Sequence, residues 1–185
     1  MVALVKPDGF RFAGHAIVTA DGMIADAAGD IPELLRDPED RRLFQAALDD
    51  ASVVVLGRKG HARHPNQGRK RLVLTASVDA MEEDVEDRAA RYWNPEGASL
   101  KSALEQFGVV GGTVAVTGGL RVFDLFLPIL DEFVLAEVHS ETLAGGIQCF
   151  TSGHPRNVLA DAGIVPMSYR VLTPVRRVTQ AVWRR

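Results

Sequence analysis

The sequence of 185 residues contains a single cysteine, Cys149, and no long apolar run. One cysteine excludes an internal disulfide, a zinc ribbon and a CxxC redox pair. No stretch approaches the roughly 18 apolar residues of a membrane span, and the first residues lack the pattern of a signal peptide. The 21 basic and 24 acidic residues nearly balance, which argues against a wholly basic nucleic-acid binder. We therefore expect a cytoplasmic protein that binds neither membrane nor nucleic acid.

Other functional classes lack their sequence signals as well. The five histidines show neither HxH nor HExxH spacing, so no metal site is expected. No serine lies in a GxSxG context, which leaves a hydrolase triad unsupported. Cys149 is best interpreted as a small buried hydrophobe. No repeat, low-complexity tract or linker divides the chain, so we expect one domain over residues 1–185.

Hydrophobic residues make up 46% of the chain, the usual share for a globular domain with a real core. Five short runs rich in Val, Ile and Leu predict strands that are covered on both faces. They cover residues 15–18, 53–56, 72–74, 114–116 and 133–138. Helical patterns lie between them: one with Asp37 as N-cap and Pro38 as first residue, one from Ser99, and one over 121–127, ended by Pro128.

The order of these elements predicts the fold class. Strands that alternate with helices require crossover connections, and these produce a mainly parallel sheet. The last part of the chain differs, because side chains alternate over 169–172 and 176–183 on either side of Thr173 and Pro174. This pattern predicts an antiparallel hairpin at the edge of the sheet. We expect an α/β domain with a central sheet flanked by helices.

A basic window covers residues 57–78, with six Lys or Arg side chains and no acidic residue. It surrounds two expected strand ends, and ligands of open α/β sheets lie outside the carboxyl ends of the strands. Six cations at that place would attract an anion such as a phosphate-bearing cofactor. Gly57, Arg58 and Lys59 directly follow a strand and could hold a terminal phosphate. Ordinary surface charge is the alternative interpretation.

A second glycine turn, Gly118 and Gly119, follows the 114–116 strand and leads into a helix. Glycine lets a ligand approach the backbone, and the free N–H groups of a helix start can bind an anion. A tight turn with no ligand explains the pair equally well. The chain has neither GxGxxG nor GxxxxGK[ST], so the usual dinucleotide and P-loop arrangements are not supported.

Asp40 shares the inward face of its helix with Leu43, Phe44 and Ala47. The helix dipole favours an acid in the first turn, so a structural role explains Asp40 by itself. A carboxylate beside apolar residues can also serve as a proton donor or as an anchor for a protonated heterocycle. Both interpretations stay open.

Taken in order, several segments resemble motifs of the dihydrofolate reductase-like superfamily. Residues 19–25 (TADGMIA) are similar to "SxDGxIA", typical of the reductase domain of riboflavin-biosynthesis deaminase-reductases and of free-standing relatives. Further segments resemble "GxLPW" (29–32), "PxDxxxF" (38–44), "GRxT" (57–59), "GRxNIVLS" (68–75) and "GGGxVY" (118–123). The resemblance covers nearly the whole chain, and the order of the motifs makes it specific.

This resemblance implies a dihydrofolate reductase-like fold and an NADPH-dependent oxidoreductase. Its substrate would be a small nitrogen heterocycle, either the ribosylaminopyrimidine of riboflavin biosynthesis or a pterin. Asp40 matches the family's substrate-binding acid, and the implied substrate residues are Asp40, Phe44 and Arg69. The implied cofactor residues are Ile17, Ile24, Gly57, Arg58, Lys59, Thr75, Gly118, Gly119, Leu120, Arg121, Val122 and Phe123. Relatives also suggest a homodimer.

Four positions depart from the family motifs. Glu33 replaces a tryptophan, Gly60 a threonine of the phosphate turn, Leu120 a third glycine, and Ala136 a threonine that supports the acid in folate enzymes. The HxE and PCxxC motifs of the deaminase half are missing, so the chain resembles a reductase domain alone. A true dihydrofolate reductase is one alternative. A nucleotide-binding protein that has lost catalysis is the other.

Overall fold

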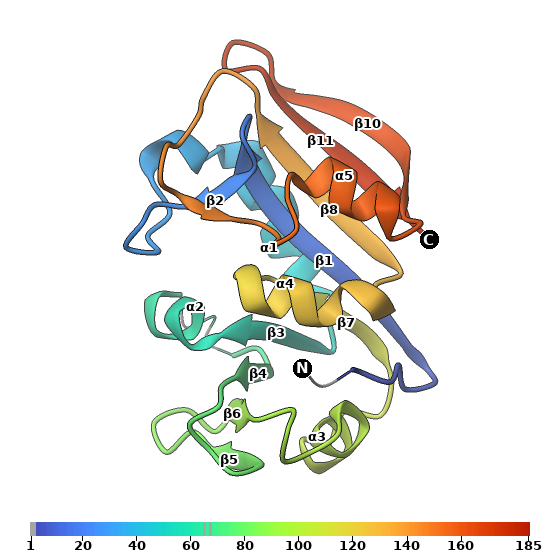
Figure 1. Ribbon diagram of the computed structural model, residues 1–185. Coiled ribbons are helices and arrows are strands. Elements are labelled where there is room, and N and C mark those ends of the chain that lie inside the picture. The colour runs from blue at the N-terminus through green and yellow to red at the C-terminus, as the bar shows by residue number, and fades with distance from the viewer. Residues whose placement is uncertain (1–2, 65, 67) are drawn as a thin grey trace.

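The computed structural model describes residues 3–64, 66 and 68–185, and its centre is a sheet of nine strands in the order β10-β11-β8-β1-β7-β3-β4-β6-β5 (Figure 1). The strands are β1 (Phe10–Thr19), β3 (Val53–Gly57), β4 (Arg71–Leu74), β5 (Met81–Glu83), β6 (Ala90–Trp93), β7 (Gly112–Val116), β8 (Glu132–Val138), β10 (Val165–Thr173) and β11 (Val178–Arg184). The six strands from β8 to β6 run parallel, whereas β10, β11 and β5 are antiparallel to their neighbours. The predicted mainly parallel sheet and C-terminal hairpin are confirmed. A separate pair joins β2 (Met23–Ala25) to β9 (Ile147–Gln148).

The helices are α1 (Pro38–Asp49), α2 (Arg58–Arg63), α3 (Leu100–Gln106), α4 (Leu120–Phe126) and α5 (Pro155–Asp161), with 3-10 turns η1 (Glu33–Leu35) and η2 (Leu127–Ile129). The predicted caps are present: Asp37 accepts hydrogen bonds from the backbone at the start of α1, and Ser99 does so for α3. The third predicted helix, α4, ends at Phe126, just before Pro128, and the chain continues through this proline as the 3-10 turn η2.

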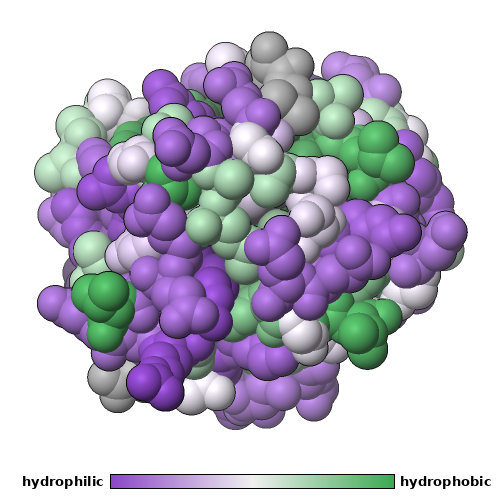
Figure 2. Space-filling view, turned by 90° about the horizontal axis from the view of Figure 1, so that it is seen from below, coloured by the Kyte–Doolittle hydropathy of each residue, from purple (hydrophilic) through white to green (hydrophobic). Residues whose placement is uncertain are grey.

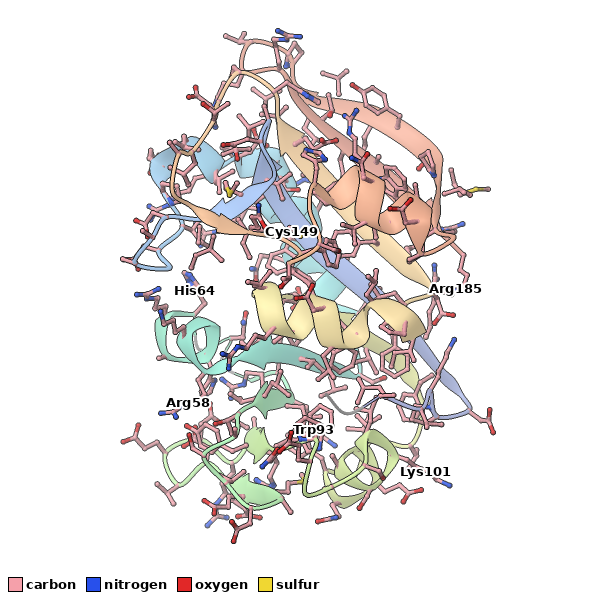
Figure 3. All side chains as sticks on the ribbon, viewed as in Figure 1. Arg58, His64, Trp93, Lys101, Cys149 and Arg185 are labelled. Atoms are coloured by element: carbon pink, nitrogen blue, oxygen red, sulfur yellow. The ribbon has the colours of Figure 1, made fainter. Side chains whose placement is uncertain are left out.

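Two layers of helices cover the sheet. Buried side chains of α3, α4 and α5 pack on one face, around an aromatic cluster that includes Phe12, Phe123, Phe133 and Phe150. Helix α1 packs on the other face through Leu48, and Figure 1 shows α4 and α5 in front of the sheet with α1 behind it. Cys149 lies in the interior as predicted (Figure 3), and burial raises the pKa of its thiol.

Sequence patterns missed β6 and α2 for a physical reason. Strand β6 has only two fully buried side chains, Ala90 and Trp93, with Arg91 and Tyr92 half-buried between them. Helix α2 buries none of its residues completely. Neither segment therefore shows the continuous or periodic apolar pattern by which strands and helices are recognised.

The two edges of the sheet differ chemically. Edge strand β10 exposes the alternate residues Val165, Met167, Tyr169 and Val171 by 50 to 63%. The face seen from the β5 side is mainly hydrophilic, with scattered apolar residues (Figure 2). The homodimer stays a prediction. In the described ranges, no helix has the length and apolar character to cross a membrane.

Candidate functional site

Two glycine turns lie side by side at the carboxyl ends of β3 and β7, where the Gly57 N–H donates to the Gly118 carbonyl oxygen at 3.1 Å. Gly118 has a φ of +92°, and a Cβ there would lie 2.5 Å from Phe123, so the fold itself requires this glycine. Gly119 differs, because its backbone is extended and a Cβ would meet Ile24 at an ordinary 3.9 Å. A Cβ at Gly57 would likewise meet Val122 at 3.7 Å. At both positions a Cβ would meet only ordinary contacts within the protein, and the two glycines leave bare backbone that a ligand could approach.

The basic window is not the single cationic surface that the sequence predicted. Strands β3 and β4 are parallel, with Gly57 opposite Leu74, so the chain returns to the amino end of the sheet between them. Arg58 and Lys59 therefore lie at the carboxyl end, while the 69–71 segment lies at the amino end. Acidic side chains from outside the window also pair with three of its cations, in the pairs Arg63–Asp30, Arg69–Asp49 and Arg71–Asp87.

Of the cations in the basic window, Arg58 and Lys59 remain beside the glycine turns. Within the described part of the chain, no carboxylate lies within ion-pair distance of either. Arg58 Nη1 donates to the Ser77 hydroxyl at 2.5 Å, and the Ser77 N–H donates to the Thr75 hydroxyl at 3.0 Å. Figure 3 shows Arg58 pointing outward on the side where α2 lies. Ser77 was missed because it lies two residues beyond the motif that ends at Thr75.

The other implied cofactor residues differ in exposure. Val122 and Phe123 are buried in the core, so only their backbone could face a ligand. Leu120 is half-buried and Arg121 exposed at the start of α4, next to Gly119. Ile17 lies in β1 opposite Ala136 of β8, on the face that α1 covers.

Asp40 lies in the first turn of α1 above this same part of the sheet. Its Oδ1 accepts a hydrogen bond from Gln180 Nε2 at 3.2 Å, and Gln180 lies in β11 opposite Ala136. The side-chain amide oxygen of Gln180, Oε1, in turn accepts from Arg170 Nε at 2.9 Å and from its Nη2. Burial raises the pKa of Asp40 from 3.8 to about 6, although the Gln180 hydrogen bond and the charge of Arg170 lower it. The nearby Asp37 carboxylate adds to the rise.

Phe44 and His15 complete the surroundings of Asp40. Phe44 lies one turn further along α1, and its ring centroid is 5.9 Å from that of His15 in β1. Burial lowers the pKa of His15 to about 4, against the opposing charge of Glu132, so the ring is neutral at neutral pH. Neither His15 nor Gln180 was expected at the site from the sequence. Each of these two is a polar residue within an apolar strand, and that was the only signal in the sequence that could have pointed to them.

Arg69 is not brought beside Asp40. It lies near the far end of α1, where its Nε and Nη2 donate to Asp49 at 3.0 and 2.5 Å and its Nη1 donates to Gln45 at 3.0 Å. Nine residues of helix separate Asp40 from Asp49, or about 13 Å. An open cavity of about 580 Å³ borders this end, lined by Arg41, Gln45, Asp49, Arg63, His64, Asn66, Gly68 and Arg69.

No family model and no curated protein sequence match this chain. Solved structures do: a protein of Shewanella sp. PV-4 assigned to riboflavin biosynthesis superposes with a TM-score of 0.68 at 17% identity, over 95% of this chain and 98% of that one. This chain has the dihydrofolate reductase-like fold. The resemblance stated from the motifs is thereby confirmed at the level of the fold.

Two further similar structures have the same fold. One is the diaminohydroxyphosphoribosylaminopyrimidine deaminase/5-amino-6-(5-phosphoribosylamino)uracil reductase of Thermotoga maritima, with a TM-score of 0.66, 17% identity and 94% of this chain covered. The match spans 56% of that longer chain. The other is dihydrofolate reductase of Enterococcus faecalis complexed with NADP(H) and RAB-propyl, with a TM-score of 0.67 and 18% identity, over 95% of this chain and 96% of that one.

Proposed function

We propose that this protein is an NADPH-dependent reductase that acts on a small nitrogen heterocycle. The observation that carries the proposal is the pair Gly57 and Gly119 in two adjacent turns, where a Cβ would meet only ordinary contacts within the protein. Bare backbone at the carboxyl ends of parallel strands is where an open α/β sheet admits a pyrophosphate. The Enterococcus neighbour is complexed with NADP(H), which supports this choice of cofactor.

In this proposal the glycine turns hold the pyrophosphate, and Arg58 with Ser77 holds the phosphate on the adenosine ribose. The bound cofactor supplies the hydride, and the protein supplies orientation and proton placement. Asp40 keeps its proton up to about pH 6 because of its burial. A carboxyl group with such a pKa can anchor a heterocycle or pass it a proton near neutral pH.

The neighbours in riboflavin biosynthesis favour a ribosylaminopyrimidine as substrate, with a pterin as the second choice. The open cavity at the far end of α1 carries Arg41, Arg63, His64 and Arg69 against one acid, Asp49. A substrate with an anionic tail about 13 Å from its ring would place that tail there. Arg69 is already paired with Asp49 and Arg63 with Asp30, so His64 is the group better placed to meet a tail at this end.

The proposal is tested by following the loss of NADPH absorbance with dihydrofolate, dihydrobiopterin and the riboflavin-pathway pyrimidine. We expect turnover with one of the three. Oxidation with dihydrofolate alone would make the protein a true dihydrofolate reductase. Tight NADPH binding without turnover on any of them would favour a nucleotide-binding protein that has lost catalysis. No NADPH binding would contradict the proposal altogether.

Arg58→Ala should weaken NADPH binding by about 10- to 100-fold and leave NADH binding almost unchanged. The lost interaction is a charge-assisted one of about 1.5–3 kcal/mol, and about 1.4 kcal/mol corresponds to tenfold in affinity. Within the described residues no carboxylate pairs with Arg58 or Lys59, and NAD preference usually requires an acid at this place to bind the two ribose hydroxyls. Fluorescence titration with both cofactors measures the effect. Arg88→Ala, an exposed arginine elsewhere, is the charge-matched control. Equal affinity of the wild type for NADPH and NADH would contradict the prediction.

A further inference from the structure

The C-terminal hairpin holds the first turn of α1 through side-chain hydrogen bonds. The Thr173 hydroxyl donates to Asp37 Oδ2 at 2.6 Å, and Arg176 donates to the Arg36 carbonyl oxygen at 2.6 Å. Gln180 Nε2 adds the bond to Asp40 Oδ1 at 3.2 Å. Asp37 and Gln180 are each 3% exposed, so two of these contacts are shielded from water. The hairpin is therefore part of the surroundings of the acid as well as the edge of the sheet.

Arg170 determines which end of the Gln180 amide faces Asp40. A guanidinium can only donate hydrogen bonds, so the amide must turn its carbonyl oxygen toward Arg170. The amide NH₂ then necessarily points the other way, toward the Asp40 carboxyl group. Such a network assigns the amide orientation without ambiguity.

Gln180 also lies next to Ala136, the position where folate enzymes carry a threonine. Ala136 of β8 is directly opposite Gln180 of β11 in the sheet and is completely buried. An alanine offers no side-chain donor to a carboxyl group above it. Strand β11, the neighbour of β8, thus provides through Gln180 the hydrogen-bond donor that β8 lacks.

We infer that Gln180, oriented by Arg170, is the positioning residue of Asp40. This inference rests on the proposed role of Asp40 as the acid of a reductase. The bond holds Oδ1 and leaves Oδ2 to meet a substrate. Because a donated hydrogen bond favours the ionised carboxylate, it also opposes the effect of burial on the proton affinity of Asp40.

The test is a carbon-13 NMR titration of the Asp40 carboxyl carbon in the substrate-free protein. Gln180→Met keeps the length of the side chain but removes the donor, and we expect the pKa of Asp40 to rise by about one unit. Gln180→Glu keeps the shape and the contact to Arg170, yet brings a second carboxylate, so the rise should be larger. Arg170→Met, at an exposed position, removes a charge that lowers the Asp40 pKa and also frees the amide to rotate, and it should give a smaller rise. The pH profile of kcat/KM should move by the same amounts.

Thr179→Val is the matched control. Thr179 neighbours Gln180 in β11 but faces the opposite side of the sheet, where its hydroxyl is 2.7 Å from His139 Nε2. This variant loses a hydrogen bond in the same strand and should leave the Asp40 titration unchanged. An unchanged Asp40 pKa in folded Gln180→Met, or in Arg170→Met if the first variant does not fold, would overturn the inference. Because the titration needs no substrate, such a failure leaves the reductase proposal intact. Conversely, absence of reductase activity leaves the titration readable.

Discussion

Asp40→Asn should lower turnover on the true substrate by about 10²–10⁴-fold, the range expected when an acid–base group is lost. Asparagine keeps the size of the side chain and can still accept the Gln180 bond, but it cannot titrate. NADPH affinity should stay the same, because Asp40 lies in α1 and not at the glycine turns. Turnover of the variant should recover in part at low pH, where solvent protonates the substrate. Steady-state kinetics over acidic and neutral pH measure both effects.

The same substitution should raise the free energy of unfolding at neutral pH by about 1–3 kcal/mol. The folded-state pKa of about 6 lies above the usual 3.8, so the folded protein binds this proton more tightly than the unfolded chain does. This tighter binding of the proton stabilises the folded protein. Its contribution to the free energy of unfolding is complete below pH 3.8 and is lost as the pH rises through 6. Each unit of pKa shift corresponds to about 1.4 kcal/mol.

If Asp40 has only a structural role, Asp40→Asn should lower the free energy of unfolding instead of raising it. A carboxylate that only stabilises the helix dipole would cost up to about 1 kcal/mol when neutralised. Urea denaturation at neutral and acidic pH distinguishes the two cases. Glu39→Gln is the control, because Glu39 lies in the same turn but pairs with Arg42 on the surface. Wild-type turnover combined with lower stability would give Asp40 a structural role at the helix N-terminus and nothing more.

Gly119→Val should abolish NADPH binding, with a loss of about 10²-fold or more, and leave the fold intact. The φ of −80° and ψ of −158° at this position lie in the extended region, which valine adopts. The added side chain projects into the space where the proposal places the pyrophosphate. Each charge-assisted hydrogen bond that it prevents is worth about 1.5–3 kcal/mol. Calorimetric titration with NADPH and circular dichroism measure binding and folding.

Two other glycines of the same strand–turn region serve as controls. Gly118→Ala should destabilise the fold itself, because its Cβ would lie 2.5 Å from Phe123 at a positive φ. Gly111→Ala lies at the amino end of β7, with the Gly9 carbonyl oxygen 3.2 Å from the new Cβ, and should leave NADPH binding unchanged. Normal NADPH binding by a folded Gly119→Val protein would show that the turn has a structural role only.

The sequence by itself determined the fold class and much of the element order. Continuous apolar runs such as 53–56 and 114–116 predicted buried parallel strands, and Asp37 and Ser99 predicted two helix starts correctly. These features are local, because a run of β-branched residues or a capping side chain acts on its own segment. Taken in order, motifs along the chain resemble those of the dihydrofolate reductase-like superfamily, and the structure confirms this resemblance at the level of the fold.

Only the tertiary structure decided how the charged and polar groups meet. The basic window divides between the two ends of the sheet because the crossover from β3 to β4 carries the chain back. Gln180 reaches Asp40 across 140 residues of sequence, and a Cβ would clash with Phe123 at Gly118 but meet only an ordinary contact at Gly119. Hydrogen bonds and ion pairs of this kind depend on which strands are neighbours and in which register. Local propensity and apolar periodicity contain no such information, because they specify burial but not partners.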